Sequence, residues 1–233
     1  MNIEVLADAD AAARRAAQFI ATEARAAIAA RGRFALAVSG GRTPWQMLRI
    51  LATLDLPWNG VHLFQVDERV APAGDPDRNL TQIAASFTAN APLPPSHVHA
   101  MPVEDADLAG AAARYARELA TVAASPPVLD LAHLGLGPDG HTASLVPGDP
   151  VLDVTDRDVA LTGVYLGRMR MTLTYPVLNR ARRILWLATG AEKAAMLARL
   201  AAGDRGIPAG RVEGDRAVIL ADAAAMGTQA QQQ

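Results

Sequence analysis

A histidine on a glycine-rich loop is the part of this sequence best suited to chemistry. The loop reads Gly135-Leu-Gly-Pro-Asp-Gly-His141, and it follows an apolar run, residues 128–134, with the length and composition of a buried strand. Histidine titrates nearest neutral pH, so His141 is a candidate general base, and Asp139 is placed to orient or tune it. Open α/β sheets bind ligands beyond the carboxyl ends of their strands, where this loop is expected.

The same loop matches the G-x-G-x-x-G pattern of dinucleotide-binding proteins at Gly135, Gly137 and Gly140. That pattern requires a long helix opening at its third glycine. Pro147 leaves room for barely two helical turns, and Asp139 puts negative charge where a pyrophosphate would lie. We therefore favour the catalytic interpretation, while a purely structural role for a single loop histidine stays open at this point.

A second loop, Ser39-Gly-Gly-Arg-Thr43, has the composition of an anion site, because its glycines expose backbone N–H groups before a helix N-terminus. An ordinary strand-to-helix turn has a similar composition and remains an alternative. Ser39 also resembles a degenerate nucleophile elbow, but Gly41, Arg42 and Thr43 separate it from the helix expected at Pro44, which disfavours a serine nucleophile.

Positive charge can reach the same place from several loops. In a parallel sheet, the four loops that follow predicted strands gather at one edge, and these loops are residues 39–43, 67–79, 135–144 and 189–193. They and the segment near 170 carry Arg42, Arg69, Arg170 and Lys193, which are suited to binding a phosphate. Lys193 is the only lysine among 22 basic residues. Either this position requires a compact ammonium group, or its uniqueness is chance.

The elements that must position these loops follow from hydrophobic periodicity. The expected helices are residues 9–30, 44–54, 80–88, 106–123 and 191–202, and Thr43 is expected to cap the second, with Pro44 at its first position. The expected strands or extended segments are residues 34–38, 61–66, 128–134, 158–164, 169–174, 184–188 and 217–221. This alternation predicts an α/β fold, a mostly parallel sheet with helices on both faces.

Length and composition set the frame for this fold. The 233 residues, 51% of them apolar, suit one large domain over residues 1–226, with a disordered tail over 227–233. A net charge of −2 implies no nucleic-acid partner, and the absence of cysteine excludes disulfides and thiolate chemistry. Because no leader pattern and no run of membrane-spanning length is seen, we expect a cytoplasmic location without a membrane partner.

Taken together, the motifs resemble those of the glucosamine-6-phosphate isomerase/6-phosphogluconolactonase family in order and approximate spacing over nearly the whole chain. The matching segments are Ser39–Pro44, Asp67–Pro72, Asn79, Gly135–Ser144, Arg170–Thr174 and Gly190–Lys193. The resemblance implies the Rossmann-like fold of glucosamine-6-phosphate deaminases. It also implies hydrolysis of 6-phospho-D-glucono-1,5-lactone to 6-phospho-D-gluconate in the oxidative pentose phosphate pathway, with no cofactor. No metal is expected either, because the sequence has no H-E-x-x-H motif or carboxylate cluster.

Within that resemblance, we expect His141 to deprotonate water, Asp139 to orient His141 or the water, and Arg69 or loop N–H groups to stabilise the oxyanion. The residues expected to hold the substrate, and chiefly its phosphate, are Gly40, Gly41, Arg42, Thr43, Asp67, Arg170 and Lys193. The partner is then a small sugar-phosphate lactone, and the protein is expected to be a monomer, although a weak dimer stays open.

The chain departs from the family pattern near the expected phosphate site. Arg42 and Arg78 stand where serine is usual, and Gly167-Arg168-Met169 replaces a proline-rich approach to Arg170. Which of these four arginines dominates phosphate binding is therefore open. Two other functions also stay open: a sugar-phosphate deaminase or isomerase with the same fold, and a non-catalytic protein that binds sugar phosphates.

Overall fold

Seven parallel strands form the central sheet of the computed structural model, which describes residues 1–227. Their order is β1-β10-β9-β6-β2-β3-β5, and every neighbouring pair is parallel. The strands are β1 (Asn2–Leu6), β2 (Phe34–Val38), β3 (Val61–Gln65), β5 (Val98–His99), β6 (Leu131–Leu134), β9 (Ile184–Ala188) and β10 (Ala217–Asp222). The predicted parallel α/β architecture is confirmed.

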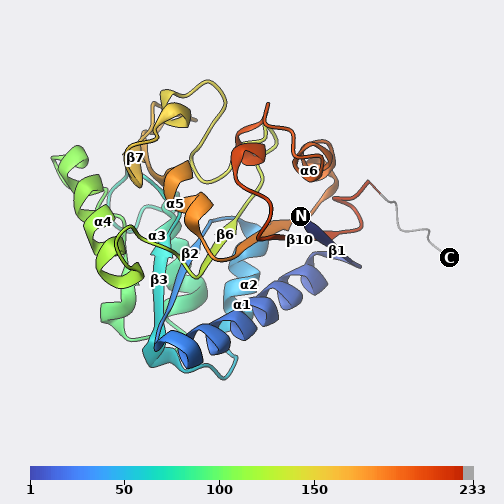
Figure 1. Ribbon diagram of the computed structural model, residues 1–233, viewed down its shortest axis with the longest axis horizontal. Helices are drawn as coiled ribbons and strands as arrows, with labels where there is room; N and C mark the ends of the chain where they lie inside the picture. The colour runs from blue at the N-terminus through green and yellow to red at the C-terminus, as the bar shows by residue number, and fades with distance from the viewer. Residues whose placement is uncertain (228–233) are drawn as a thin grey trace.

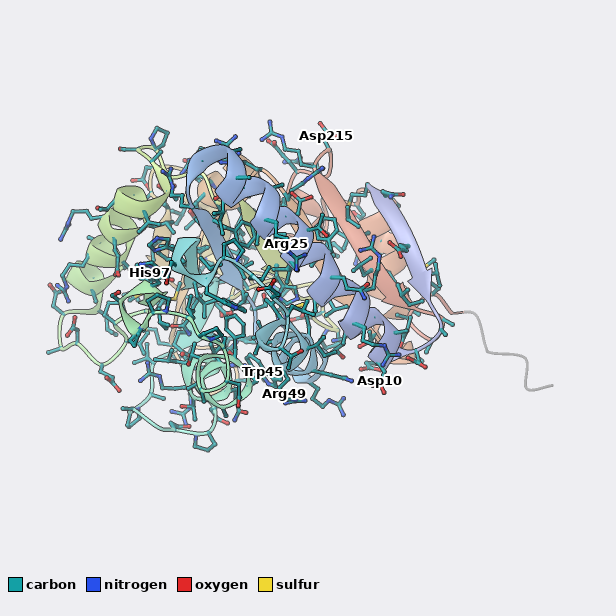
Figure 2. All side chains as sticks on the ribbon, turned by 90° about the horizontal axis from the view of Figure 1, so that it is seen from below. Asp10, Arg25, Trp45, Arg49, His97 and Asp215 are labelled. Carbon is teal, nitrogen blue, oxygen red and sulfur yellow. The ribbon has the colours of Figure 1, made fainter. Side chains whose placement is uncertain are left out.

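Helices cover both faces of this sheet (Figure 1). They are α1 (Ala9–Arg31), α2 (Arg42–Ala52), α3 (Asn79–Ile83), α4 (Leu108–Ala123), α5 (Tyr175–Arg180) and α6 (Ala194–Ala201). In β2, Leu36 packs into the core beneath α1 and α2, whereas Ala35 and Ala37 pack into the core beneath α4. All five residues of β2 are buried because alternate side chains enter opposite cores. Figure 2 views the α1 and α2 side, where Arg25, Trp45 and Arg49 lie.

The direction in which the chain crosses the sheet changes between two central strands. From β2 the chain continues to β3 and β5 on one side, whereas β6 pairs with β2 and leads to β9 and β10 on the other. The carboxyl ends of β2 and β6 therefore form a topological switch point, which is where open α/β sheets bind ligands. Ser39 and Gly135 directly follow these two strands.

A second sheet, of three antiparallel strands, lies beside this edge. It consists of β4 (Asp67–Arg69), β8 (Arg170–Leu173) and β7 (Val159–Leu161), in the order β4-β8-β7. Residues 67–69 were expected to be loop, and that prediction is wrong. Asp67 pairs with Thr172 and Arg69 pairs with Arg170, so two arginines far apart in the sequence lie directly opposite each other.

Other local differences have simple physical reasons. Strand β1 and helix α5 were not predicted; β1 is a half-exposed edge strand and α5 has only six residues, too few for periodicity to show. Helix α2 begins two residues earlier than expected, its N-cap is Gly41, and the hydroxyl of Thr43 bonds Thr189 instead of capping the helix. The segment expected as one helix at 80–88 is α3 followed by a π-helical turn, Ala84–Thr88.

Short 3₁₀ turns complete the structure, namely Trp58–Gly60, Pro95–His97, Pro150–Asp153, Ala191–Lys193 and Pro208–Arg211. Of the predicted tail, residues 228–233 lie outside the described residues. Within residues 1–227, no helix is both long enough and apolar enough to cross a membrane.

Candidate active site

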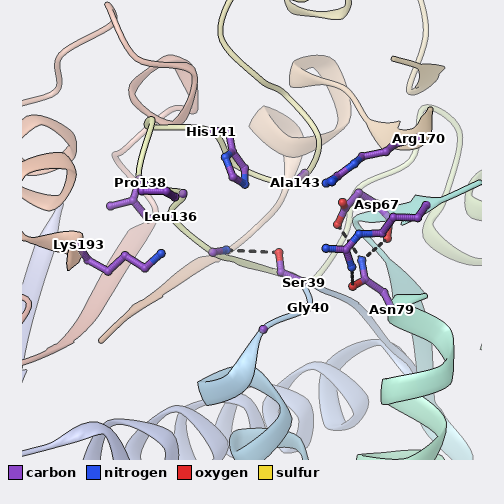
Figure 3. Close-up of a pocket in the computed structure, with 14 residues that line it drawn as sticks. Ser39, Gly40, Asp67, Asn79, Leu136, Pro138, His141, Ala143, Arg170 and Lys193 are labelled. Carbon is purple, nitrogen blue, oxygen red and sulfur yellow. Dashed lines mark hydrogen bonds between the residues drawn. The ribbon is translucent and has the colours of Figure 1, made fainter. Parts of the chain in front are cut away.

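The four loops expected to meet at one sheet edge do meet, and they enclose a cavity of about 210 Å³ (Figure 3). Its wall contains seven residues that the sequence predicted for the site: Gly40, Gly41, Asp67, Arg69, His141, Arg170 and Lys193. Ser39, Asn79, Ala143 and the glycine loop from Gly135 to Pro138 complete the wall. The cavity therefore contains one imidazole, three cationic side chains and one carboxylate.

His141 is held by Asp139 as a charge-assisted pair. Its Nδ1 lies 2.5 Å from Asp139 Oδ1, and its backbone N–H donates to the same oxygen at 3.1 Å. We assign the Nδ1 proton from this bond, which leaves the lone pair on Nε2 free. Asp139 stands behind His141 and outside the cavity wall, so it orients the imidazole without lining the cavity.

The pKa of Asp139 lies below its ordinary value. Partial burial alone would raise this pKa, but hydrogen bonds from the backbone and ring of His141, and one from Tyr165, outweigh burial and lower it. Asp139 is therefore a carboxylate at neutral pH, which is the form that can orient the imidazole and stabilise an imidazolium.

Glycine is required within the loop for this arrangement. A Cβ atom placed on Gly137 would collide with the imidazole ring of His141. Gly140 has a φ of +82°, and a Cβ there would lie 2.8 Å from Cβ of Ile207. The loop can therefore turn back beneath the histidine only with glycine at both positions. Bridged turn residues Thr142–Leu145 follow instead of a helix, so the dinucleotide-binding context is missing.

Two guanidinium groups face the cavity from the small antiparallel sheet. Arg69 donates to Oδ1 of Asn79, whose amide in turn donates to the Asp67 carbonyl at 2.9 Å. The Asp67 carboxylate accepts from Ser144 Oγ at 2.6 Å, and this hydroxyl lies 3.5 Å from Nη1 of Arg170. Asp67 is 5% exposed and contacts the arginines through these neighbours, which indicates a positioning role.

Arg69 and Arg170 carry like charges close together, and Arg170 is also largely buried. Burial, and then the nearby charge of Arg69, lower the pKa of Arg170 from its ordinary value, although it stays protonated at neutral pH. Nε of Arg170 is buried without a hydrogen-bond partner among the described residues. An anion in the cavity would relieve this repulsion, so the electrostatics favour an anionic ligand.

The remaining predicted phosphate binders separate into two places. Lys193 lies in the cavity wall across from Arg170, with His141 between them (Figure 3). Arg42 and Thr43 line a neighbouring groove of about 800 Å³ that shares Gly40, Gly41, Gly135, Leu136 and Lys193 with the cavity. The structure thus brings Lys193, but not the side chain of Arg42, into the cavity.

Four arginines, namely Arg42, Arg78, Arg168 and Arg170, were candidates for the main phosphate-binding residue, and the structure separates them. Arg78 is 4% exposed and pairs with Glu68 and Glu104, while Arg168 pairs with Asp75 at 3.0 Å and with Asp77 at 3.2 Å. Neither lines the cavity. Arg170 is therefore the only one of the four whose side chain is part of the cavity wall.

Ser39 does not have the surroundings of a nucleophile. Its hydroxyl donates to the His133 carbonyl at 3.1 Å and accepts from the Gly135 N–H at 3.3 Å. The His133 ring is fully buried, and burial lowers its pKa to about 3. Ser39 thus lies in the cavity wall, where its hydroxyl joins the ends of β2 and β6.

Three side chains that bond residues in or beside the site were not predicted from the sequence. Ser144, whose hydroxyl bonds Asp67, lies within a motif that was recognised. Glu68 is fully buried and accepts from the backbone N–H groups of Asn79 and Leu80 at 2.7 and 2.8 Å, which fixes the start of α3. Tyr165 donates to Asp139 Oδ2 at 3.0 Å, and no sequence signal indicates this contact.

The chain falls into a class of sugar-phosphate enzymes, as its family match shows. The family model described as glucosamine-6-phosphate isomerases/6-phosphogluconolactonase matches residues 7–220, and the chain belongs to this family. The match covers all the residues of the cavity wall and every strand of the two sheets except β1 and the last two residues of β10.

Several relatives of this chain carry the name 6-phosphogluconolactonase. A 6-phosphogluconolactonase from Synechocystis is 39% identical over 82% of this chain and 81% of its own length. One from Streptomyces coelicolor is 37% identical over 94% of this chain and 90% of its own. The crystal structure of 6-phosphogluconolactonase from Thermotoga maritima superimposes with a TM-score of 0.84 at 29% identity, covering 95% of this chain and 98% of that one.

Proposed function

We propose that this protein hydrolyses 6-phospho-D-glucono-1,5-lactone to 6-phospho-D-gluconate in the oxidative pentose phosphate pathway, with His141 as general base. The observation that carries the assignment is the Asp139–His141 pair at the edge of a cavity that also holds Arg69, Arg170 and Lys193. The names of the family relatives support the same substrate.

The reaction needs a base for water and a cation for the oxyanion. Nε2 of His141 takes a proton from water as the water oxygen bonds to the lactone carbonyl carbon. The tetrahedral oxyanion then collapses, the bond from that carbon to the ring oxygen breaks, and the imidazolium returns the proton to the ring oxygen. Asp139 holds the imidazole and stabilises its charged form throughout.

The cations of the cavity divide the binding work. Arg69 and loop N–H groups stabilise the oxyanion, whereas Arg170 and Lys193, with the backbone of Gly40 and Gly41, hold the phosphate. Arg42 and Thr43 act from the neighbouring groove, where the N-terminus of α2 adds partial positive charge. Binding the remote phosphate positions the lactone ring for attack.

Acid release tests the assignment. Freshly generated 6-phosphogluconolactone is followed in weak buffer with and without the protein, and the rate must exceed spontaneous hydrolysis. Ammonia release from glucosamine 6-phosphate is measured in parallel, because it would identify a deaminase of the same fold. Calorimetry that detects 6-phosphogluconate binding without either reaction would identify a binding protein instead.

Four further properties belong to this proposal. The chain forms one catalytic domain over residues 1–226, works as a monomer without nucleic-acid or membrane partners, and acts in the cytoplasm. Small-angle scattering or sedimentation across a hundredfold range of concentration tests the oligomeric state, and a dimer mass would contradict it. Cell fractionation tests the location.

A further inference from the structure

Tyr165 contacts both the Asp139–His141 pair, here called the dyad, and Arg170, but it does not line the cavity. Its hydroxyl donates to Asp139 Oδ2 at 3.0 Å, and its ring meets the His141 ring edge-on with centroids 5.5 Å apart. The guanidinium carbon of Arg170 lies 4.9 Å from the centroid of the same ring, within the range of a cation–π contact. One side chain therefore contacts the dyad and the proposed phosphate-binding arginine.

The contacts of Asp139 show what the hydroxyl does. Oδ1 of Asp139 accepts both bonds from His141, and Oδ2 accepts the bond from Tyr165, so each carboxylate oxygen has a fixed partner. Burial, and then the bond to Asp139, raise the pKa of Tyr165, so it remains a neutral donor. By sharing the carboxylate charge, this donor limits how strongly Asp139 attracts a proton to His141.

The turn that follows Tyr165 has an unfavourable backbone conformation at Leu166. Tyr165 and Arg168 exchange backbone hydrogen bonds of 2.9 and 3.3 Å around a two-residue turn in which Leu166 has a φ of 50° and Gly167 a φ of 80°. A leucine in the left-handed region is unfavourable, and this one is 79% exposed, so its side chain gains little packing in return. Arg168 fastens the turn to Asp75.

We propose that Tyr165 is a positioning residue that couples phosphate binding to the catalytic base: its hydroxyl sets the orientation and basicity of the dyad, and its ring face holds Arg170 in place. This inference rests on the proposed function. It separates into two parts, because Tyr165→Phe removes only the hydroxyl whereas Tyr165→Leu also removes the ring.

Steady-state kinetics of acid release between pH 5 and 9 test both parts, with Tyr175→Phe as the matched control. Tyr175 donates its hydroxyl to the Pro208 carbonyl at 2.9 Å and does not line the cavity. Thermal melts establish that each variant is folded. The charged groups facing His141 are Asp139 and, across the cavity, Asp67, Arg69, Arg170 and Lys193, and all are retained in every variant.

For Tyr165→Phe we expect kcat to fall by about tenfold as the dyad loses its fixed geometry. The acidic limb of the kcat/KM profile should move to higher pH, because Asp139 without the Tyr165 donor keeps more of its negative charge facing His141. KM for the phosphorylated lactone should change by less than about twofold, since the ring face stays beneath Arg170.

For Tyr165→Leu we expect the same losses and, in addition, a KM for the phosphorylated lactone raised by roughly 2- to 30-fold, the range of a lost cation–π contact. Tyr175→Phe should keep the kinetics of the unmodified protein. If Tyr165→Phe retains both kcat and the pH profile, or if Tyr165→Leu matches Tyr165→Phe in KM, the coupling is refuted. Failure of the unmodified protein to exceed spontaneous hydrolysis would instead refute the proposed function.

Discussion

Histidines lie at both ends of the parallel sheet, and their neighbours differ. At the carboxyl end, His141 bonds a carboxylate and faces a cavity with three cationic side chains. Near the start of β3 and at β5, His62 Nδ1 lies 3.1 Å from His99 Nε2, and the His62 ring stacks on His97 with centroids 4.0 Å apart. His97 is labelled on this side of the molecule in Figure 2.

The difference shows that neighbours determine what a histidine can do. Glu118 at the amino end bonds His99 at 2.5 Å, which leaves His62 among other imidazoles. Burial, followed by the charges of His97, His99 and Arg33, lowers the pKa of His62 to about 4. An imidazole in that environment is a poor proton acceptor near neutral pH, whereas one held by its own carboxylate beside an open cavity suits general base catalysis.

The largest expected effect is the loss of His141. His141→Gln should fold normally and reduce lactonase activity by roughly 10²- to 10⁴-fold, because an amide cannot take the proton from water. His97→Gln is the matched control from the opposite end of the sheet, and it should retain activity within about twofold. Initial rates of acid release measure both. Activity of His141→Gln within threefold of the unmodified protein would remove His141 from the mechanism.

Removing a cavity cation should affect binding more than turnover. Arg170→Ala should weaken binding of the phosphorylated lactone and of 6-phosphogluconate by roughly 1.5–3 kcal/mol, the range for hydrogen bonds to charged groups. Unphosphorylated gluconolactone should be little affected. Arg33→Ala removes a cation near His62, at the opposite end of the sheet, and should change the binding of neither lactone. Equal losses on both lactones would show that Arg170 has a structural or catalytic role instead.

Much of this fold was predictable because the central strands are short, apolar and separated by helices with clear periodicity. Residues 34–38 and 184–188 were predicted with the bounds that the structure has. The small antiparallel sheet was predicted only in part. The extended segments expected at 158–164 and 169–174 contain β7 and β8, whereas β4 was missed because it reads Asp-Glu-Arg and has no apolar residue to give a strand signal. Its pairing with β8 is a tertiary interaction across about a hundred residues, and local propensity does not encode such contacts.

The candidate site was predictable where glycines and charges stand in loops after strands. His141, Asp139 and Lys193 were found in this way, and Lys193 also stood out as the single lysine. Tyr165 could not be found, because it lies 26 residues further along the chain than Asp139, between two expected extended segments, and no local pattern indicates that its side chain reaches Asp139. The turn after Tyr165 has Leu166 at a position where glycine or asparagine is usual, so the sequence lacks the usual signal of a tight hairpin turn.

Protonation of His62, at the amino end of the sheet, should destabilise the folded protein in acid. The pKa of His62 is about 4 in the folded protein against an ordinary value of 6.5, so the unfolded chain binds this proton more tightly. The corresponding stability is fully present above pH 6.5 and is lost as the pH falls from there towards 4. Because His62 is partly exposed, solvent screening limits the loss at pH 4.5 to about 1 kcal/mol.

Urea unfolding at pH 7.5 and 4.5 measures this effect by comparing the protein with His62→Gln. Gln retains an amide that can donate to His99 but does not titrate. The variant should lose about 1 kcal/mol less on acidification than the unmodified protein. Equal losses in the two proteins would mean that His62 is not acid-sensitive, and the contrast between the two ends of the sheet would then rest on geometry alone.

The smallest expected effect concerns backbone strain beside the active site. Leu166→Asn should raise the free energy of unfolding by roughly 0.5–1 kcal/mol, because asparagine tolerates the left-handed conformation that leucine resists. Val164→Asn is the matched control, since Val164 is 72% exposed and does not have a positive φ. It should change stability by less than about 0.5 kcal/mol, as surface substitutions usually do.

Because Tyr165 keeps its contacts in Leu166→Asn, kcat should be unchanged. A stabilised variant with reduced kcat would show that the strain itself contributes to catalysis, and equal stabilities of the two variants would show that the turn stores none.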